Sequence, residues 1–154
     1  MSSAFVTVLR GNVGGTAQTV ADSTWTTVLF DIIQTDGVHT TMYDTATGVF
    51  TIPVNGWYDL ESEITWAATG GTLKATRIIR QDPNFPIFVG QYDDTVLTTR
   101  IRHRGYFSLG ETLSIQVYQD SGIGADIAAS LDPDAVGQPG HCTNAMITLI
   151  KEVS

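Results

Sequence analysis

The sequence predicts an all-β domain built as an antiparallel sandwich of two sheets. Short runs rich in Val, Ile, Thr, Tyr and Phe recur along the chain, and Gly, Asp, Asn and Pro separate them. No segment repeats apolar residues at helical spacing over the length of a helix. About ten short strands of this kind fit two packed sheets.

The expected strands follow one another from end to end of the chain. Glycine can adopt positive φ without a side-chain clash, so turns are expected where it follows a polar residue or ends a run. Such turns are predicted at Asp36-Gly37, Thr47-Gly48, Asn55-Gly56, Gly70-Gly71 and Leu109-Gly110. Strands are predicted at Ala4–Leu9, Thr26–Ile33, Val49–Pro53, Trp57–Trp66, Thr72–Gln81, Pro86–Gln91, Val96–Phe107, Thr112–Gln119 and Thr143–Glu152, with weaker ones near Thr16–Val20 and Thr40–Tyr43.

A single domain over residues 1–154 is expected, because no internal repeat, low-complexity tract or charge run divides the chain. A domain of this size buries roughly 68–70% of the surface of its unfolded chain, so it needs no covalent staple. The single cysteine, Cys142, cannot form a disulfide within the chain and is expected to be a buried structural thiol.

The charge balance argues against two classes of partner. Eight basic and sixteen acidic residues give a net charge of −8, which repels phosphate backbones and anionic membrane surfaces. We therefore expect no nucleic-acid partner. The sequence has no stretch of about 18 apolar residues, so we also expect no membrane insertion by a helix.

The sequence carries no pattern that indicates an enzyme. A Gly-x-Ser-x-Gly elbow is absent, and the histidines His39, His103 and His141 have no carboxylate partner by spacing. His141 and Cys142 are adjacent, so on an extended strand they would point to opposite faces. We expect no catalytic residue and no cofactor.

Calcium is the one ion that the sequence leaves open. Paired carboxylates occur at Asp93-Asp94 and at Asp132 with Asp134, and oxygen-rich loops can hold Ca²⁺. No EF-hand spacing accompanies them.

One long connection is expected between the last two strong strands. Ser121–Cys142 is rich in Gly, Ala, Pro and Asp, and unstructured connections longer than roughly 12–15 residues are often functional. It is either a packed surface loop, with a short helix or strand at Ala125–Leu131, or a binding loop. The candidate binding residues are Asp126, Asp132, Asp134 and His141.

The middle of the chain has a distinctive spacing of aromatic residues and glycine. Tyr43 precedes Phe50 by seven positions, Phe50 precedes Gly56 by six, and Gly56 precedes Tyr58 by two, within the segment FDIIQTDGVHTTMYDTATGVFTIPVNGWYDLESEI. This pattern resembles the central signature of the C1q/TNF-like domain. The segments AFV near the start and LGETLSIQV at 109–117 resemble the opening and late strands of that family.

The resemblance implies a two-sheet antiparallel jelly-roll that assembles as a homotrimer. Phe30, Tyr43, Phe50 and Tyr58 lie at strand positions that can bring large rings together. Each ring can bury roughly 150–250 Å², so we interpret all four as core residues and not as ligand contacts.

Two predicted strands carry charges at alternate positions. Side chains alternate between the faces of a strand, so Asp59, Glu61 and Glu63 share one face of Trp57–Trp66. The same rule places a basic row on one face of Val96–Phe107, opposite Ile101, His103 and Phe107. The basic row consists of Arg100, Arg102 and Arg104.

In the fold that the resemblance implies, these two strands are neighbours in the sheet that faces the trimer axis. Opposite charges across a strand pair contribute roughly 0.2–1 kcal/mol each and favour one register. The hypothesis is that the six charged residues line the surface between subunits. The alternative is a solvated outer face with weak surface pairs.

The functional expectation combines the resemblance with the start of the chain. The sequence opens with Met shortly before the first strand, without a leader peptide or a Gly-X-Y stem, both of which are usual in secreted animal relatives. We expect a self-contained, non-enzymatic homotrimer on a virion surface, either as a phage capsid decoration protein or as the head of a tail fibre. Its partners would be capsid or tail proteins and a cell-surface glycan or protein receptor. The alternative is a secreted C1q/TNF-like ligand or lectin-like recognition domain.

Overall fold

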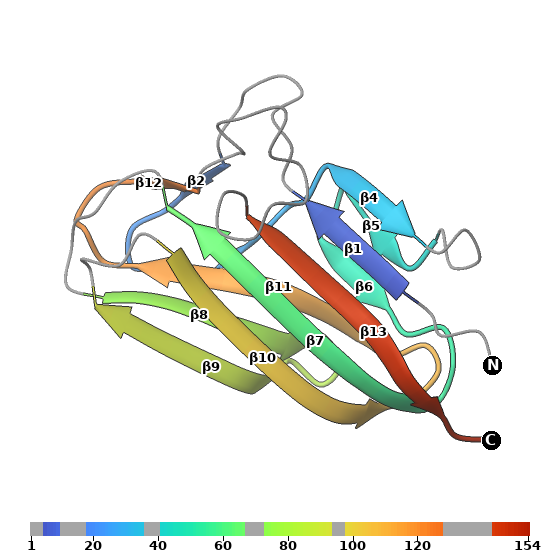
Figure 1. Ribbon diagram of the computed structural model, residues 1–154. Coiled ribbons are helices and arrows are strands. Elements are labelled where there is room, and N and C mark those ends of the chain that lie inside the picture. Colours follow the sequence, from blue (N-terminus) through green and yellow to red (C-terminus); the bar gives the residue numbers. More distant parts are fainter. Residues whose placement is uncertain (1–4, 10–17, 36–40, 67–72, 94–97, 128–142) are drawn as a thin grey trace.

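The computed structural model describes residues 5–9, 18–35, 41–66, 73–93, 98–127 and 143–154. Every regular element within these ranges is a strand (Figure 1). No helix in this part of the chain is long and apolar enough to cross a membrane. The strands are β1 (Phe5–Leu9), β2 (Gln18–Val20), β3 (Thr26–Thr27), β4 (Ile32–Thr35), β5 (Tyr43–Asp44), β6 (Val49–Thr51), β7 (Gly56–Thr65), β8 (Leu73–Arg80), β9 (Phe85–Asp93), β10 (Thr98–Phe107), β11 (Thr112–Gln119), β12 (Ala125–Ile127) and β13 (Asn144–Glu152).

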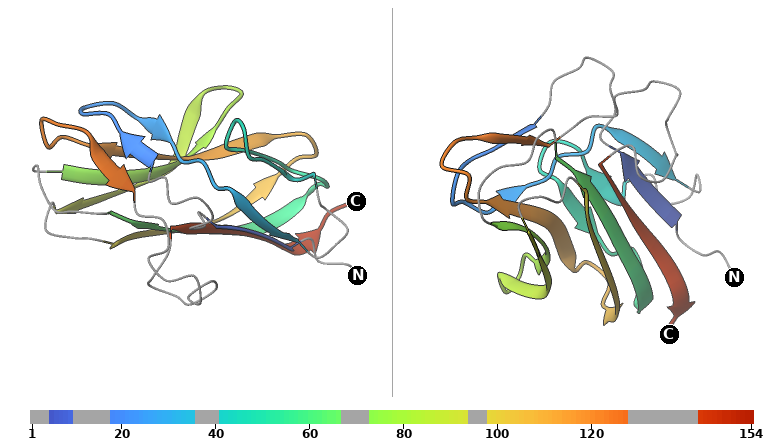
Figure 2. Two further views of the ribbon diagram at one scale, coloured as in Figure 1. Left: turned by 90° about the horizontal axis from the view of Figure 1, so that it is seen from above. Right: turned by 60° about the vertical axis from the view of Figure 1, so that its left-hand side comes forward.

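The strands form two packed sheets, as predicted. The front sheet, nearest the viewer in Figure 1, has the order β10-β7-β13-β1-β4. The back sheet has the order β5-β6-β11-β8-β9, and β3 also pairs with β11. All pairings are antiparallel, and Figure 2 shows the two layers from above. The chain has the two-sheet jelly-roll fold that the resemblance implied.

The chain crosses between the sheets at almost every step. β6 lies in the back sheet, β7 in the front sheet and β8 in the back sheet, and the alternation resumes from β10 through β11 to β13. Because consecutive strands alternate between the sheets, strands that are distant in the sequence become neighbours within each sheet. This arrangement makes β7 and β10 neighbours although β8 and β9 lie between them in the sequence.

The four predicted core rings are buried. Phe30, Tyr43, Phe50 and Tyr58 are at most 4% exposed. The Tyr43 ring lies 5.9 Å from Phe30 and 4.5 Å from Phe50 between centroids, whereas Tyr58 packs against Phe107 at 6.2 Å. The Tyr43 hydroxyl accepts a hydrogen bond from the backbone N–H of Phe30, which satisfies its polar end within the core.

The single strand predicted at Thr26–Ile33 is wrong, because the chain changes sheets within it. β3 pairs with β11 of the back sheet, and β4 pairs with β1 of the front sheet. Between them, the Val28 N–H still donates to the Ile115 carbonyl at 2.9 Å. A continuous apolar run does not reveal which sheet each part of it joins.

The predicted positive φ is confirmed at Gly48 (72°) and Gly110 (82°) and is wrong at Gly56. Gly56 is the first residue of β7 and is buried. A Cβ there would lie 2.6 Å from Cδ1 of Leu149 and 2.7 Å from the carbonyl oxygen of Lys151. The close approach of β13, and not a turn, therefore requires glycine at this position. The predicted turns at Asp36-Gly37 and Gly70-Gly71 include residues outside the described ranges.

The long connection after β11 begins with regular structure. Its first part forms β12, which pairs with β2 as a separate two-stranded ribbon, so the strand alternative at the start of Ala125–Leu131 is confirmed. Ile127 also bridges to Trp66. Residues 128–142, including Cys142, lie outside the described ranges.

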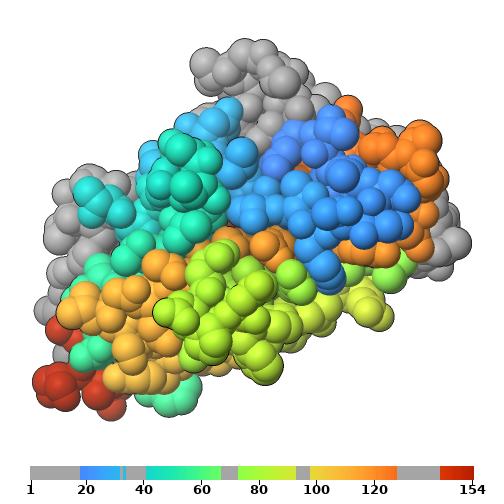
Figure 3. All heavy atoms as spheres, turned by 180° about the vertical axis from the view of Figure 1, so that it is seen from behind, coloured from blue at the N-terminus to red at the C-terminus, as the bar shows by residue number. Residues whose placement is uncertain are grey.

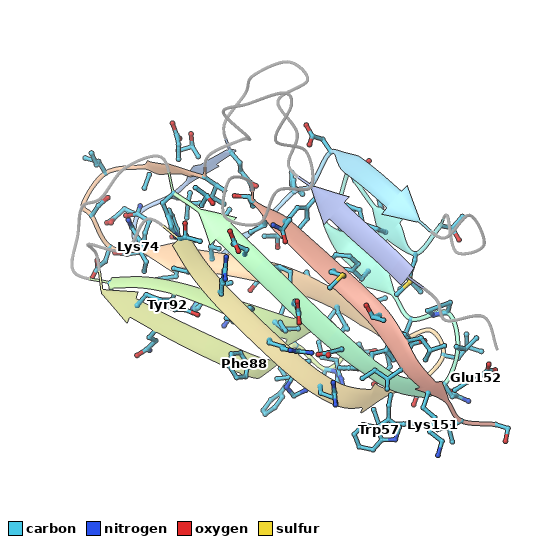
Figure 4. All side chains as sticks on the ribbon, in the orientation of Figure 1. Trp57, Lys74, Phe88, Tyr92, Lys151 and Glu152 are labelled. Atoms are coloured by element: carbon cyan, nitrogen blue, oxygen red, sulfur yellow. The ribbon has the colours of Figure 1, made fainter. Side chains whose placement is uncertain are left out.

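The edge strands β9 and β10 of the two sheets meet at one side of the sandwich. The Tyr92 hydroxyl of β9 donates to the Arg100 carbonyl of β10. Phe88 of β9 lies 6.2 Å from the ring of His103, which lies 6.3 Å from the ring of Phe107. Figure 4 shows Phe88 and Tyr92 along this side.

Candidate interaction surface on the front sheet

The acidic and basic rows predicted from the sequence lie side by side on the front sheet. β7 and β10 lie side by side and pair antiparallel along their whole length (Figure 1). Their register places each arginine of one row opposite one acid of the other. The predicted neighbourhood of the two rows is therefore confirmed. The opposed pairs are Arg100 with Glu63, Arg102 with Glu61 and Arg104 with Asp59.

Four of these residues, Arg102, Arg104, Asp59 and Glu61, form one network of ion pairs, and Arg100 with Glu63 forms a separate pair beside it. Arg100 Nε lies 2.5 Å from Glu63 Oε2, and Arg102 Nε lies 2.9 Å from Glu61 Oε1. Arg104 Nη2 lies 3.0 Å from Asp59 Oδ2. Arg102 also reaches diagonally to Asp59, because its Nε and Nη2 donate to the two carboxylate oxygens. We call the six residues the charged ladder.

The two rows lie at different depths on the face. The side chains of Asp59 and Glu63 are only 12% and 9% exposed, whereas those of the three arginines are 60–64% exposed. The hydrogen bonds from Arg102 hold the pKa of Asp59 at about 2, against the opposing effect of burial. Asp59 is thus a buried, ionised carboxylate, Glu63 lies equally deep, and the guanidinium groups form the outer surface.

Two aromatic residues extend the charged ladder toward the lower end of the sheet. Trp57 precedes Asp59 by two positions and Tyr106 follows Arg104 by two, so both lie on the ladder face, where they are 46% and 42% exposed. Their ring centroids are 6.2 Å apart. The same two-residue period that predicted the ladder would have found this pair, which the sequence analysis missed.

A β-bulge adds an aliphatic side chain to this end of the face. The register of β13 against β7 shifts between Leu149 and Lys151, and Ile150 is left 46% exposed. A bulge inserts an extra residue into one strand, here Ile150 between the pairs Leu149–Tyr58 and Lys151–Trp57. Figure 4 shows Trp57 beside Lys151 at the lower end of the sheet. We call Trp57, Tyr106 and Ile150 the apolar end of the face.

A second exposed apolar group lies on the edge strand β9. Phe85, Phe88 and Val89 are 60%, 37% and 44% exposed. Large exposed apolar side chains on an edge strand are unusual in a monomer and typically mark a contact with another chain. We call these three residues the β9 edge.

The remaining candidate residues are not brought together in the described structure. Asp126 lies on β12 and not in a loop, and it accepts a hydrogen bond of 2.6 Å from the Thr19 hydroxyl. Asp132, Asp134 and His141 lie outside the described ranges, so their binding role stays a prediction.

Calcium likewise stays a prediction. Asp94, Asp132 and Asp134 and the side chain of Asp93 are not described. Among the described residues, no three His, Cys, Asp or Glu side chains are grouped so that they could hold a metal ion.

The architecture and this face define the class of fold. With five- and six-stranded antiparallel sheets and this strand order, the chain has the C1q/TNF-like jelly-roll fold. It is similar to the crystal structure of murine APRIL, with a TM-score of 0.65 and 12% identity over 97% of this chain and 100% of the other.

Two other solved structures show the same fold. The globular domain of zebrafish complement 1qA aligns with a TM-score of 0.54 and 14% identity over 97% of this chain and 99% of the other. The Eiger TNF of S. frugiperda aligns with a TM-score of 0.64 and 9% identity over 99% and 94%. No protein-family model and no curated protein matches the sequence.

Proposed function

We propose that this protein is a non-enzymatic binding module that assembles as a homotrimer, with the ladder face of the front sheet between subunits. The observation that carries the proposal is the composition of this face. It joins three outward guanidinium groups to an exposed apolar end of Trp57, Tyr106 and Ile150. Aromatic residues and arginine are the residue types most enriched at protein interfaces.

The β9 edge provides the second contact surface that a cyclic trimer needs. In a cyclic trimer each contact joins two different surfaces, one from each neighbour, and the rotation closes after three copies. The chain offers two such surfaces, the ladder face and the β9 edge. Phe85, Phe88 and Val89 of one subunit would cover part of the ladder face of the next.

The outer layer of arginines retains donors for a partner. Each guanidinium group carries five N–H donors, and the described ion pairs of Arg100 and Arg104 use few of them. Carbonyl groups of an approaching subunit could accept the others. The buried carboxylates would keep the arginines oriented before assembly, which lowers the entropy cost of association.

Sedimentation equilibrium tests the trimer directly. We expect the wild-type protein to have three times the chain mass of 16.6 kDa, and Arg102→Glu to reduce that mass and the melting temperature. Tyr106→Glu provides a second test, since Tyr106 belongs to no ion pair of the ladder. Thr51→Glu is the matched control, because it adds a charge at an exposed position of the back sheet.

Circular dichroism of each variant separates lost assembly from lost folding. A folded Tyr106→Glu protein of unchanged trimeric mass would refute the proposed interface, as would a wild-type protein that stays monomeric at high concentration. Loss of the trimer in both ladder-face variants, with Thr51→Glu still trimeric, would support it.

The setting of the trimer has two candidates. The sequence-based hypothesis is a virion surface, where the trimer decorates a capsid or forms a fibre head and recognises a host surface. The fold is equally that of secreted C1q/TNF-like ligands, which keeps the alternative of an extracellular recognition domain. Capsid, portal or tail genes beside the coding sequence would support the first, and a collagen or leader segment upstream would support the second.

A further inference from the structure

We propose that the back sheet carries a binding site for a sugar with a single carboxylate, centred on Arg77. This site deepens the proposed recognition role and rests on it, and it lies on the opposite sheet from the ladder face. Arg77 is on β8, directly opposite Gln116 of β11 and Val89 of β9. Figure 3 shows this side of the molecule, where residues 18–30 in blue lie beside orange residues, and β3 within the blue segment pairs with β11.

The guanidinium group of Arg77 is held in place from two sides. Its Cζ lies 4.1 Å from the centroid of the Trp25 ring, at cation–π distance. Arg77 Nε and Nη2 donate to the same oxygen of Gln116, at 2.9 Å and 2.6 Å. The amide nitrogen of Gln116 in turn donates to the Thr27 hydroxyl at 3.2 Å. The ring of Tyr118 packs against Trp25 at 5.5 Å.

Arg77 differs from the other arginines of the described ranges in its partner. Arg80, Arg100, Arg102 and Arg104 each form an ion pair with a carboxylate, whereas within those ranges the side chain of Arg77 is bound only by a neutral amide and an indole ring. Arg77 is partly buried, and that burial lowers its pKa, although the group stays charged at neutral pH. A partly desolvated cation without a counterion is unfavourable, and an anionic ligand would compensate it.

The hydrogen bonds of Arg77 to Gln116 leave one edge of its guanidinium group for a carboxylate ligand. Both donors to Gln116 lie on the Nε side, so the edge formed by Nη1 and the second hydrogen of Nη2 faces away from it. Two parallel N–H donors of this kind match the two oxygens of a carboxylate. Since stacking on Trp25 and the amide fix the guanidinium plane, little side-chain entropy would be lost on binding.

The surroundings favour a sugar that carries one negative charge. The net charge of −8 disfavours polyanions, and Arg77 is the single cation of this cluster. The neighbouring groups are the amide of Gln116, the hydroxyl of Thr27 and the apolar ring surface of Trp25. Such neutral donors, acceptors and ring surfaces suit the hydroxyls and apolar faces of a sugar.

Calorimetric and NMR titration with 3′-sialyllactose tests the site. Lactose is the neutral matched probe, sodium acetate is the free carboxylate, and a short blocked peptide with one glutamate represents an acidic protein ligand. We expect 3′-sialyllactose to bind and lactose not to bind. Arg77→Lys keeps the charge but loses the planar fork, and it should weaken binding by roughly tenfold or more. Arg80→Lys, on the same strand and paired with Glu111 at 3.3 Å, is the control variant and should bind as the wild type does.

Three results would overturn the site: binding of lactose or acetate as tight as that of 3′-sialyllactose, tighter binding of the glutamate peptide, or no response to any probe at millimolar concentration. Unchanged affinity in a folded Arg77→Lys protein would overturn the assignment to Arg77. Sedimentation of the same samples keeps this result apart from the proposed trimer, because a trimer that binds no sugar contradicts only the sugar site.

Discussion

Arg102 donates to both carboxylate oxygens of Asp59, although the residue directly opposite Asp59 on β10 is Arg104. The pairing is therefore diagonal as well as direct, and it links neighbouring rungs of the ladder. A shift of the register by one residue would place these charges against the opposite face of β7. The network thus favours a single register of β7 and β10, whatever partner the face binds.

The ionised state of Asp59 predicts a loss of stability in acid. Its pKa falls from 3.8 to about 2 on folding, so its contribution is fully present above pH 3.8 and is lost as the pH falls toward 2. Asp59→Asn should lower the free energy of unfolding at pH 6 by about 1 kcal/mol, since the partner arginines are exposed and screened by solvent. Urea unfolding from pH 2 to pH 6 measures this.

The quantity to compare is the difference in free energy of unfolding between the wild-type protein and Asp59→Asn. It should shrink toward zero between pH 4 and pH 2 as the wild-type carboxylate becomes protonated. A constant difference over this range would show that Asp59 contributes through packing and not through its charge.

His103 predicts a second pH dependence in a separate range. Its ring lies between those of Phe88 and Phe107, and burial lowers its pKa below 6.5. The neutral form is therefore favoured in the folded protein, so stability should fall as the pH drops below about 6.5. His103→Phe should reduce this fall. Thermal unfolding at pH 5 and pH 7.5 compares the two proteins, which share every other residue. An identical pH dependence would contradict the prediction.

The layout of the strands could be predicted, but the points where the chain changes sheets could not. Alternation along Trp57–Trp66 and Val96–Phe107 predicted which side chains face outward, because strand geometry alone decides this. The break within Thr26–Ile33 depends instead on which partner strand lies near each half. That information is held in contacts between residues distant in the sequence, and periodicity does not contain it.

Glycine is required at Gly56 for lack of space and at Gly110 for its backbone conformation, and alanine substitutions can separate these two reasons. Gly56→Ala should cost about 2–3 kcal/mol, because its Cβ would overlap Leu149 and the Lys151 carbonyl of the adjacent strand. Gly110→Ala should cost only about 1–2 kcal/mol, since Gly110 has a φ of 82° but open space around it. Chemical denaturation of both variants gives the comparison. A smaller loss in Gly56→Ala than in Gly110→Ala would contradict the steric explanation.

The charged residues of the candidate surface were predicted from the sequence, whereas its exposed apolar residues were not. The charged ladder followed from the residues at alternate positions, and the apolar pair Trp57 and Tyr106 follows from the same rule. Ile150 could not be predicted, because alternation fails at a bulge and the register shift is visible only in the pairing of β13 with β7. The Arg77 site could not be predicted either, because the Trp25 ring that stacks on Arg77 is 52 positions away in the sequence.

A buried pair of threonines predicts strong coupling between the two sheets. The hydroxyl groups of Thr76 on β8 and Thr99 on β10 are 2.9 Å apart, and both residues are fully buried. Thr76→Val or Thr99→Val alone would leave one hydroxyl without a partner, at a cost of about 1–3 kcal/mol. The double variant removes both hydroxyls and keeps the shape, so it should be more stable than either single variant. A double-mutant cycle by urea denaturation measures the coupling. If the two single losses simply add, the hydroxyl pair contributes nothing as a pair to the link between the sheets.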